Sequence, residues 1–221
     1  NLRPLSEIRG PSPIKEFSTG QVLCMEFMEG ERLKNWIEKN PSLKQRQWLA
    51  DLVLDLYLHE FLEMGLVQTD PNFGNFLVKN DAELVVLDFG ACKEYSLEFR
   101  QTYKQVLRAT MAQDSQKIIS IAESFGLLDP RESDETKQVF LHMMDVVIAP
   151  FRVAGPFPFT DESYNHDTRD ATLALLKAYK HTPPPKNLVF LHRKLGGVFQ
   201  LLKRLDVSVD LSKVWVRMVK E

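Results

Sequence analysis

The segment from residue 65 to residue 91, GLVQTDPNFGNFLVKNDAELVVLDFGA, constrains the fold more than any other part of the chain. Asp70 and Asn75 lie five residues apart in a loop that follows a long apolar helical pattern, and Asp88 precedes a Phe-Gly pair. Two β-branched and aliphatic runs, residues 76–79 and 83–88, flank a three-residue turn, which predicts a β-hairpin. Because a hairpin returns next to its starting point, we expect Asp70, Asn75 and Asp88 to meet at one end of a small sheet.

These residue types suit phosphate chemistry with a divalent cation. Carboxylate and amide oxygens are the ligands that Mg²⁺ prefers, so Asn75 and Asp88 are the predicted metal ligands. Asp70, a second carboxylate one loop away, is placed to orient or deprotonate an acceptor hydroxyl. Gly90 permits a sharp turn that would aim Asp88 at the ion. Each acid or amide alone is more often a cap, a turn residue or a strand end, but together they have the spacing of the protein-kinase catalytic loop and Asp-Phe-Gly motif.

The composition, the net charge and the number of cysteines exclude several classes of protein. The chain has 221 residues, 44% of them hydrophobic and 26% charged, which is the composition of a globular domain with a substantial core. The net charge is −2 and no basic stripe alternates with aromatic residues, so we expect no nucleic-acid binding. Two cysteines cannot form a disulfide framework, which favours a reducing, intracellular compartment. No apolar run reaches 18 residues, and the chain begins with Asn, so we expect a fragment without a membrane span.

Periodicity predicts an α+β fold that is mostly α-helical. Residues 1–20 are expected to be loop, residues 22–27 a short buried strand, and residues 31–38 a short helix after a turn at Gly30. Ser42 or Pro41 then begins a long helix that ends at Gly65. Its buried stripe repeats at intervals of three and four: Leu49, Leu52, Val53, Leu56, Tyr57, Glu60, Phe61 and Met64. From Ser96 the chain is expected to be helical, with breaks at residues 126–130, 150–160 and 181–185.

Three motifs in order, QTDPNFGNFLV, LDFGACKEY and TPPPKNLVFLHRKLGG, resemble the UbiB or aarF-domain family of atypical kinase-like proteins, in its coenzyme Q branch. The resemblance implies a protein-kinase-like C-terminal lobe over residues 29–221, with residues 1–28 as a remnant of the N-terminal lobe and hinge. It implies ATP and Mg²⁺ as cofactors, with Asp70 as the catalytic-loop aspartate and Asn75 and Asp88 as metal ligands. Glu26, Phe27 and Met28 match the hinge, whose backbone would hold adenine.

The resemblance also implies a role. The family is thought to support ubiquinone biosynthesis by binding and slowly hydrolysing ATP, acting on or with lipids or small molecules. Peripheral membrane association is expected, on the matrix side of the mitochondrial inner membrane in a eukaryote, or in the cytoplasm or at the membrane in a bacterium. The family's Lys-x-Gly-Gln helix, Ala-rich phosphate loop and nucleotide-contacting lysine have no counterpart in this chain. We therefore expect half of an active site, inactive without the N-terminal lobe.

The segment after Gly90 is informative without the family resemblance. Only six residues, ACKEYS, separate Gly90 from the next helical pattern, whereas protein kinases place a long activation segment with an Ala-Pro-Glu end there. A lipid, a small molecule or water is therefore favoured as the acceptor over a protein. Two alternatives stay open: a small-molecule phosphotransferase of the aminoglycoside or choline kinase type, and a nucleotide-binding pseudokinase scaffold.

Other residues carry weaker predictions. For LHRKLGG, residues 191–197, the favoured interpretation is an amphipathic helix with Arg193 and Lys194 in water, and the alternative is a phosphate site or a support for the catalytic loop. His59 is expected to be a core or boundary histidine, and Cys92 an accessible but ordinary thiol. The Phe-rich residues 151–164 could face a membrane or partner, or could anchor a loop in the core. Pro183 to Pro185 is expected to be a stiff connector.

Overall fold

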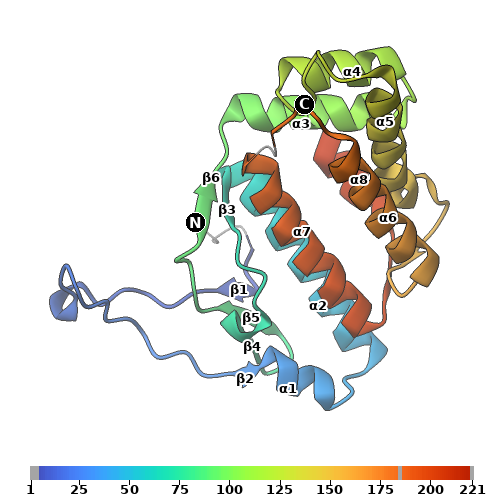
Figure 1. The fold of residues 1–221 in the computed structure, drawn as a ribbon. Coiled ribbons are helices and arrows are strands. Elements are labelled where there is room, and N and C mark those ends of the chain that lie inside the picture. The colour runs from blue at the N-terminus through green and yellow to red at the C-terminus, as the bar shows by residue number, and fades with distance from the viewer. Residues whose placement is uncertain (1–4, 184–185, 220–221) are drawn as a thin grey trace.

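The computed structural model describes residues 5–183 and 186–219, and within them the chain is an α+β fold dominated by helices. Figure 1 shows a small sheet and hairpin beside a larger helical body, with an arm that projects from the sheet. The helices are α1 (Leu33–Glu38), α2 (Leu43–Leu58), α3 (Leu97–Met111), α4 (Ser115–Ser124), α5 (Asp134–Ile148), α6 (Glu162–Ala178), α7 (Lys186–Leu205) and α8 (Leu211–Val219). The strands are β1 (Ile8–Arg9), β2 (Glu31–Arg32), β3 (Leu66–Gln68), β4 (Phe76–Lys79), β5 (Glu83–Val86), β6 (Cys92–Glu94), β7 (Phe157–Pro158) and β8 (Ser208–Val209).

The expected hairpin is present and has two different faces. β4 and β5 pair antiparallel, with Lys79 opposite Glu83, so residues 80–82 form the predicted three-residue turn. β1 and β2 extend this pair into a sheet of order β1-β5-β4-β2. Because side chains alternate along a strand, Phe76 and Val86 join the main core, whereas Leu77 and Val85 pack with Met28 on the opposite face.

The long helix begins and ends where the sequence predicts. Ser42 is the N-cap of α2 and forms a capping box with Gln45, so Ser42 rather than Pro41 starts the helix. After Leu58 the helix widens into a π-helical turn, His59–Met64, and Gly65 ends it with a φ of 66°. His59 is buried, as expected. The π-turn was not predicted, because hydrophobic periodicity does not register one extra residue in a turn.

The predicted buried strand at residues 22–27 is wrong. This segment lies in the arm, where it makes one isolated bridge, Pro13 to Met25, and Leu23 and Phe27 are 67% and 86% exposed. The Cys24 N–H donates to Ser18 Oγ and the Ser12 N–H donates to the Glu26 carboxylate, so side chains take the bonds that a continuous ladder would need. The expected helix at residues 31–38 is shorter, because Glu31 and Arg32 pair with β4 as β2 before α1 begins.

Gly30 was expected to allow a turn, but the structure gives it a different role. A Cβ at this position would lie 2.8 Å from the Cβ of Leu77, so glycine lets the chain cross closely over β4. β1, from the predicted N-terminal remnant, shares a sheet with the hairpin. The predicted boundary between residues 1–28 and residues 29–221 stays a prediction.

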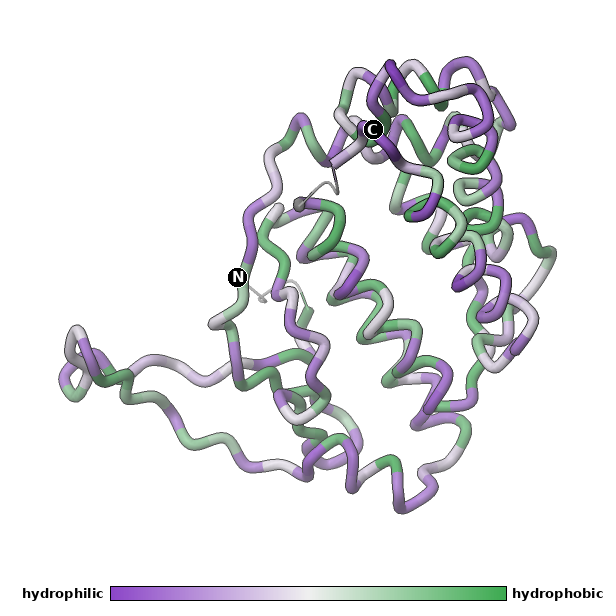
Figure 2. The backbone as a smooth tube through the Cα atoms, in the orientation of Figure 1, coloured by the Kyte–Doolittle hydropathy of each residue, from purple (hydrophilic) through white to green (hydrophobic). Residues whose placement is uncertain are grey.

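The helical body has the three predicted breaks and two that were not predicted, at residues 112–114 and 206–210. Ser96 is the N-cap of α3, and the three expected interruptions separate α4 from α5, α5 from α6, and α6 from α7. Pro184 and Pro185 of the expected stiff connector lie outside the described residues. Figure 2 shows hydrophobic and hydrophilic residues alternating along the helices, as expected for helices with one buried face.

α2 and α7 pack side by side, and their buried residues join those of the hairpin and of α8 in the main core. A second cluster lies between α3, α4 and α5. Phe157 and Phe159 are buried, so the Phe-rich segment anchors a loop rather than facing solvent. Among the described residues, no helix is both long and apolar enough to cross a membrane.

Candidate active site

The predicted catalytic loop connects β3 to β4 and brings Asp70 and Asn75 together. The Asn75 side-chain nitrogen donates a hydrogen bond to Asp70 Oδ2 at 3.1 Å. A short 3₁₀ turn, Phe73–Asn75, shapes this loop, and Asn72 caps it by accepting from the Gly74 N–H. Because the amide nitrogen of Asn75 is used for Asp70, its amide oxygen faces away from that carboxylate.

The hairpin also returns Asp88 toward Asn75. The Leu87 N–H donates to the Asn75 carbonyl at 2.9 Å, so Asp88 follows directly after a residue bonded to Asn75. Asp88 Oδ1 accepts from the Gly90 N–H at 2.7 Å, which forms the expected turn after the aspartate. Asp88 is exposed, whereas Asp70 and Asn75 are half-buried. The structure thus places all three predicted residues at one end of the hairpin.

The predicted hinge residues divide between the arm and the hairpin. Glu26 lies on the arm, where its carboxylate is 3.5 Å from Arg9, and Phe27 points into solvent. Met28 is buried against Leu77 and Val85. Of the three, Met28 is therefore the residue that contacts the hairpin carrying Asp88.

The segment after Gly90 is short and fixed, as the sequence predicts. β6 pairs antiparallel with β3, and Thr69 donates to the Ala91 carbonyl through both its N–H and its hydroxyl, at 2.9 and 2.7 Å. The chain therefore passes from the Asp-Phe-Gly turn directly onto the strand that precedes the catalytic loop. No room is left between β6 and α3 for a long activation segment.

The expectation that Lys194 lies in water is wrong. Its side chain is 6% exposed, and its Nζ lies 3.3 Å from Glu60 Oε2 and 3.3 Å from Gln68 Oε1. Glu60 belongs to the π-turn and Gln68 ends the strand that leads into the catalytic loop. Burial raises the pKa of Glu60, and the charge of Lys194 opposes that rise. This buried pair connects α7, the π-turn after α2, and the end of β3, two residues before Asp70 in the chain.

The other residues of LHRKLGG also contact the loop. Arg193 is exposed, as expected, and its guanidinium lies 3.6 Å from Asp70 Oδ1. A Cβ on Gly197 would lie 2.2 Å from the Cβ of Pro71, so glycine lets α7 touch the catalytic loop. Leu191, Leu195, Val198 and Phe199 are buried or half-buried, which confirms the predicted apolar face of α7. The motif is thus a support for the catalytic loop, which was the less favoured interpretation.

One signal in the sequence could have revealed this pair. Glu60 falls on the buried stripe of α2, where an isolated carboxylate would be costly and needs a cation. Lys194 and Gly197 are three residues apart and therefore share one face of α7. Cys92 is exposed, as expected, and burial together with the nearby Glu60 raises the pKa of its thiol, which makes the thiolate scarce.

Comparison with known proteins identifies the family. The sequence pattern of the ABC1 atypical kinase-like domain matches residues 1–122. The chain belongs to this family. It is 28% identical over 210 residues to the atypical kinase COQ8, mitochondrial, of Saccharomyces cerevisiae, covering 93% of this chain and 41% of that protein. It is 29% identical to the atypical kinase coq-8, mitochondrial, of Caenorhabditis elegans, covering 90% of this chain and 27% of the relative.

Two further relatives extend the comparison. The probable serine/threonine-protein kinase abkA of Dictyostelium discoideum is 25% identical over 97% of this chain and 39% of its own length. Among solved structures, Rv3197 of Mycobacterium tuberculosis, described in complex with erythromycin, matches with a TM-score of 0.68 at 19% identity, over 94% of this chain and 51% of that one. These likenesses show an ABC1 kinase-like fold. The chain spans between about a quarter and two-fifths of the length of the curated relatives named here.

Proposed function

We propose that this chain supplies the catalytic and metal-binding half of an atypical kinase-like ATP site. We further propose that the whole protein hydrolyses ATP in support of ubiquinone biosynthesis, acting on or with lipids or small molecules. The observation that carries the proposal is the arrangement at the hairpin end, where Asp70 accepts from Asn75 and Asp88 follows the Leu87–Asn75 bond. The relatives named atypical kinase COQ8 support the pathway and, if the source is a eukaryote, a mitochondrial location.

The donor set at the hairpin end fits a hard divalent cation. Among the described residues no three His, Cys, Asp or Glu side chains cluster as a metal site, but the proposed pair uses an amide and one carboxylate. The amide oxygen of Asn75 and the Oδ2 of Asp88 are the atoms not used in the two hydrogen bonds described above. Mg²⁺ held there would leave positions for phosphate oxygens and would neutralise their charge.

The chain's own residues divide the remaining tasks. Asp70, held by Asn75 and 3.6 Å from the Arg193 guanidinium, would orient an attacking water or hydroxyl and accept its proton. The buried apolar cluster of Met28, Leu77 and Val85 would lie beneath the adenine, beside the proposed hinge residues Glu26 and Phe27. The direct passage from Gly90 to β6 removes the usual platform for a protein substrate.

Three Asp→Asn variants of the full-length protein test the proposal. Asp88→Asn should weaken Mg-ATP binding at least about tenfold, equal to about 1.4 kcal/mol, because it removes a charged ligand of the ion. Asp70→Asn should leave that affinity nearly unchanged and slow phosphate release by about 10² to 10⁴, because it removes a general base. The matched control is Asp51→Asn on the exposed side of α2, which should change neither.

Calorimetry measures the affinity for Mg-ATP. Release of phosphate from ATP is measured in parallel with phosphoryl transfer to generic peptides. An Asp70→Asn variant as fast as wild type, or unchanged Mg-ATP affinity in Asp88→Asn, would remove the proposed roles. ATP binding without turnover in wild type would instead favour the scaffold, and robust peptide phosphorylation would contradict the proposed acceptor class.

A further inference from the structure

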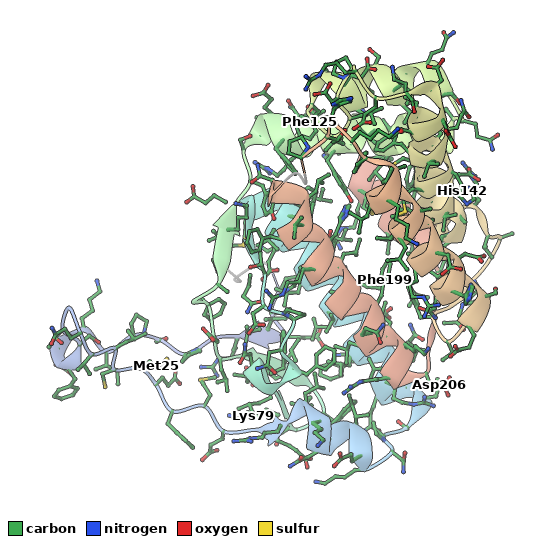
Figure 3. The ribbon with its side chains drawn as sticks, in the orientation of Figure 1. Met25, Lys79, Phe125, His142, Phe199 and Asp206 are labelled. Carbon is green, nitrogen blue, oxygen red and sulfur yellow. The ribbon has the colours of Figure 1, made fainter. Side chains whose placement is uncertain are left out.

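The helical body contains a cavity that is separate from the hairpin end. Its volume is about 280 Å³, and its walls come from α2, α3, α5, α6, α7 and α8. Hydrophobic side chains form most of the wall, among them Leu54, Leu107, Met143, Leu195, Phe199 and Met218. Figure 3 shows side chains entering the space between α7 and α6, with Phe199 labelled on α7.

Two threonine hydroxyls on the wall of the cavity are already hydrogen-bonded within their own helix. Thr168 donates its hydroxyl to the Tyr164 carbonyl at 2.8 Å, and Thr172 donates to the Thr168 carbonyl at 2.7 Å. Both hydroxyls are therefore satisfied within α6. Tyr103 and His192 form one polar end, where the Tyr103 hydroxyl lies 3.4 Å from His192 Nε2. Tyr57 and Tyr164 also line the cavity, so it is a mainly apolar chamber whose wall holds the Tyr103–His192 pair and two further tyrosines.

The size of the cavity indicates an occupant. A ligand that fills the cavity would remove its apolar wall from water, and the free-energy gain grows with the apolar area covered. An apolar cavity of about 150 Å³ stays dry and binds benzene, and this one has nearly twice that volume. Its contents therefore correspond to roughly two fused rings.

An opening lies beside α7. His192 and Gly196 both line the cavity and have solvent-exposed surface, while burial of the His192 imidazole lowers its pKa to about 4. A Cβ at Gly196 would meet nothing within 4 Å, whereas one at the neighbouring Gly197 would strike Pro71. The two glycines thus serve opposite faces of α7, one open toward the cavity and the other closed against the catalytic loop.

We propose that this cavity is a binding site for an apolar small molecule of about two fused rings, with one hydrogen-bonding group directed at Tyr103 and His192. Helix α7 separates the site from the catalytic loop, so the ligand and ATP would occupy opposite sides of one helix. The proposal does not rest on the proposed ATP site, because none of the residues assigned to that site lines the cavity.

The test uses indole as the probe and the full-length protein carrying ¹³C-methyl methionine. Met143 and Met218 line the cavity, whereas Met25 lies on the arm. Addition of indole should shift the methyl signals of Met143 and Met218 in a saturable way and leave that of Met25 unchanged. Benzene, which fills half of the volume, should bind at least threefold more weakly.

Two variants fill the cavity from opposite walls, Gly196→Leu from α7 and Thr172→Phe from α6. Each should weaken indole binding at least tenfold, whereas Ala174→Leu, on the exposed side of α6, should leave it unchanged. Methyl spectra with native dispersion confirm that each variant is folded, and either folded variant is sufficient for the test. Absence of saturable shifts up to the solubility of indole, equal shifts at Met25, or undiminished binding in a folded filled variant would overturn the proposal.

Discussion

At the scale of single residues, the buried ion pair of Glu60 and Lys194 supports the strand that leads into the catalytic loop. Replacing a buried ion pair by apolar residues is often neutral, but removing one partner leaves an uncompensated charge. The pair joins α7 to the π-turn of α2 and approaches Gln68, so its geometry is transmitted to the strand before Asp70. We therefore treat Glu60 and Lys194 as positioning residues rather than catalytic ones.

Lys194→Met should destabilise the protein by about 3–5 kcal/mol at pH 8, because it leaves the Glu60 carboxylate buried without its cation. The loss should be smaller at pH 5. A carboxyl whose pKa is raised by folding takes up a proton more readily in the folded state, so stability falls as pH rises from the unfolded pKa through the folded one. Removing Lys194 raises the folded pKa further and enlarges this dependence.

Urea denaturation at the two pH values measures the effect, and Lys203→Met is the matched control. Lys203 pairs with Glu162 at 2.8 Å, but both side chains are accessible, so its loss should cost less than about 1 kcal/mol. A double variant, Glu60→Gln with Lys194→Met, should recover part of the stability. Equal losses for Lys194→Met and Lys203→Met would contradict a structural role for the buried pair.

At the scale of elements, α7 is the helix that supports the catalytic loop, and a single small residue makes the contact possible. Gly197 faces Pro71 too closely to accept a side chain, while Gly196, one position earlier, faces open space. Glycine within a helix costs about 0.5–1 kcal/mol relative to alanine, so both glycines weaken α7. Only the contact with the loop explains the cost at Gly197.

Gly197→Ala should therefore separate α7 from the catalytic loop and reduce ATP turnover in the full-length protein, with a loss of stability of about 1–3 kcal/mol from overpacking. Gly196→Ala should instead stabilise the helix by about 0.5–1 kcal/mol and leave turnover unchanged. Thermal unfolding and phosphate release measure the two effects. The same response from both variants would show that helix propensity, and not the loop contact, determines the effect.

Most of the elements follow from local signals in the sequence. The hairpin, the capping box at Ser42, the stop at Gly65 and the breaks between the long helices depend on turn and cap residues that lie next to each other in the chain. The pairing of Lys194 with Glu60 depends on residues 134 positions apart, so neither helix alone indicates it. Residues 22–27, VLCMEF, have the composition of a strand, which led to the wrong prediction there, because composition does not supply a pairing partner.

At the scale of the whole molecule, the arm of residues 11–27 differs from the rest of the chain. It carries large hydrophobic side chains in solvent, Phe17 at 66%, Leu23 at 67% and Phe27 at 86% exposure. Figure 1 shows it projecting away from the helical body, and Figure 3 places Met25 on it. Exposed apolar side chains gathered on one segment are typical of an interaction surface. The family resemblance implies an N-terminal lobe upstream of this segment, and we propose that this lobe covers the arm.

Limited proteolysis with chymotrypsin tests this expectation on the 221-residue chain and on the full-length protein side by side. In the 221-residue chain, cleavage should occur first after Phe17 or Phe27, because both side chains are exposed and the segment is held mainly by hydrogen bonds within itself. In the full-length protein the same bonds should be cut at least about tenfold more slowly, since contact with the upstream lobe would hold the arm closed. Replacing both Phe17 and Phe27 by Ser should remove the early cleavage products without changing the rate of cleavage elsewhere. Cleavage of the arm at the same rate in both proteins would show that the upstream lobe leaves it uncovered, and the proposed hinge at Glu26 to Met28 would then lose its structural support.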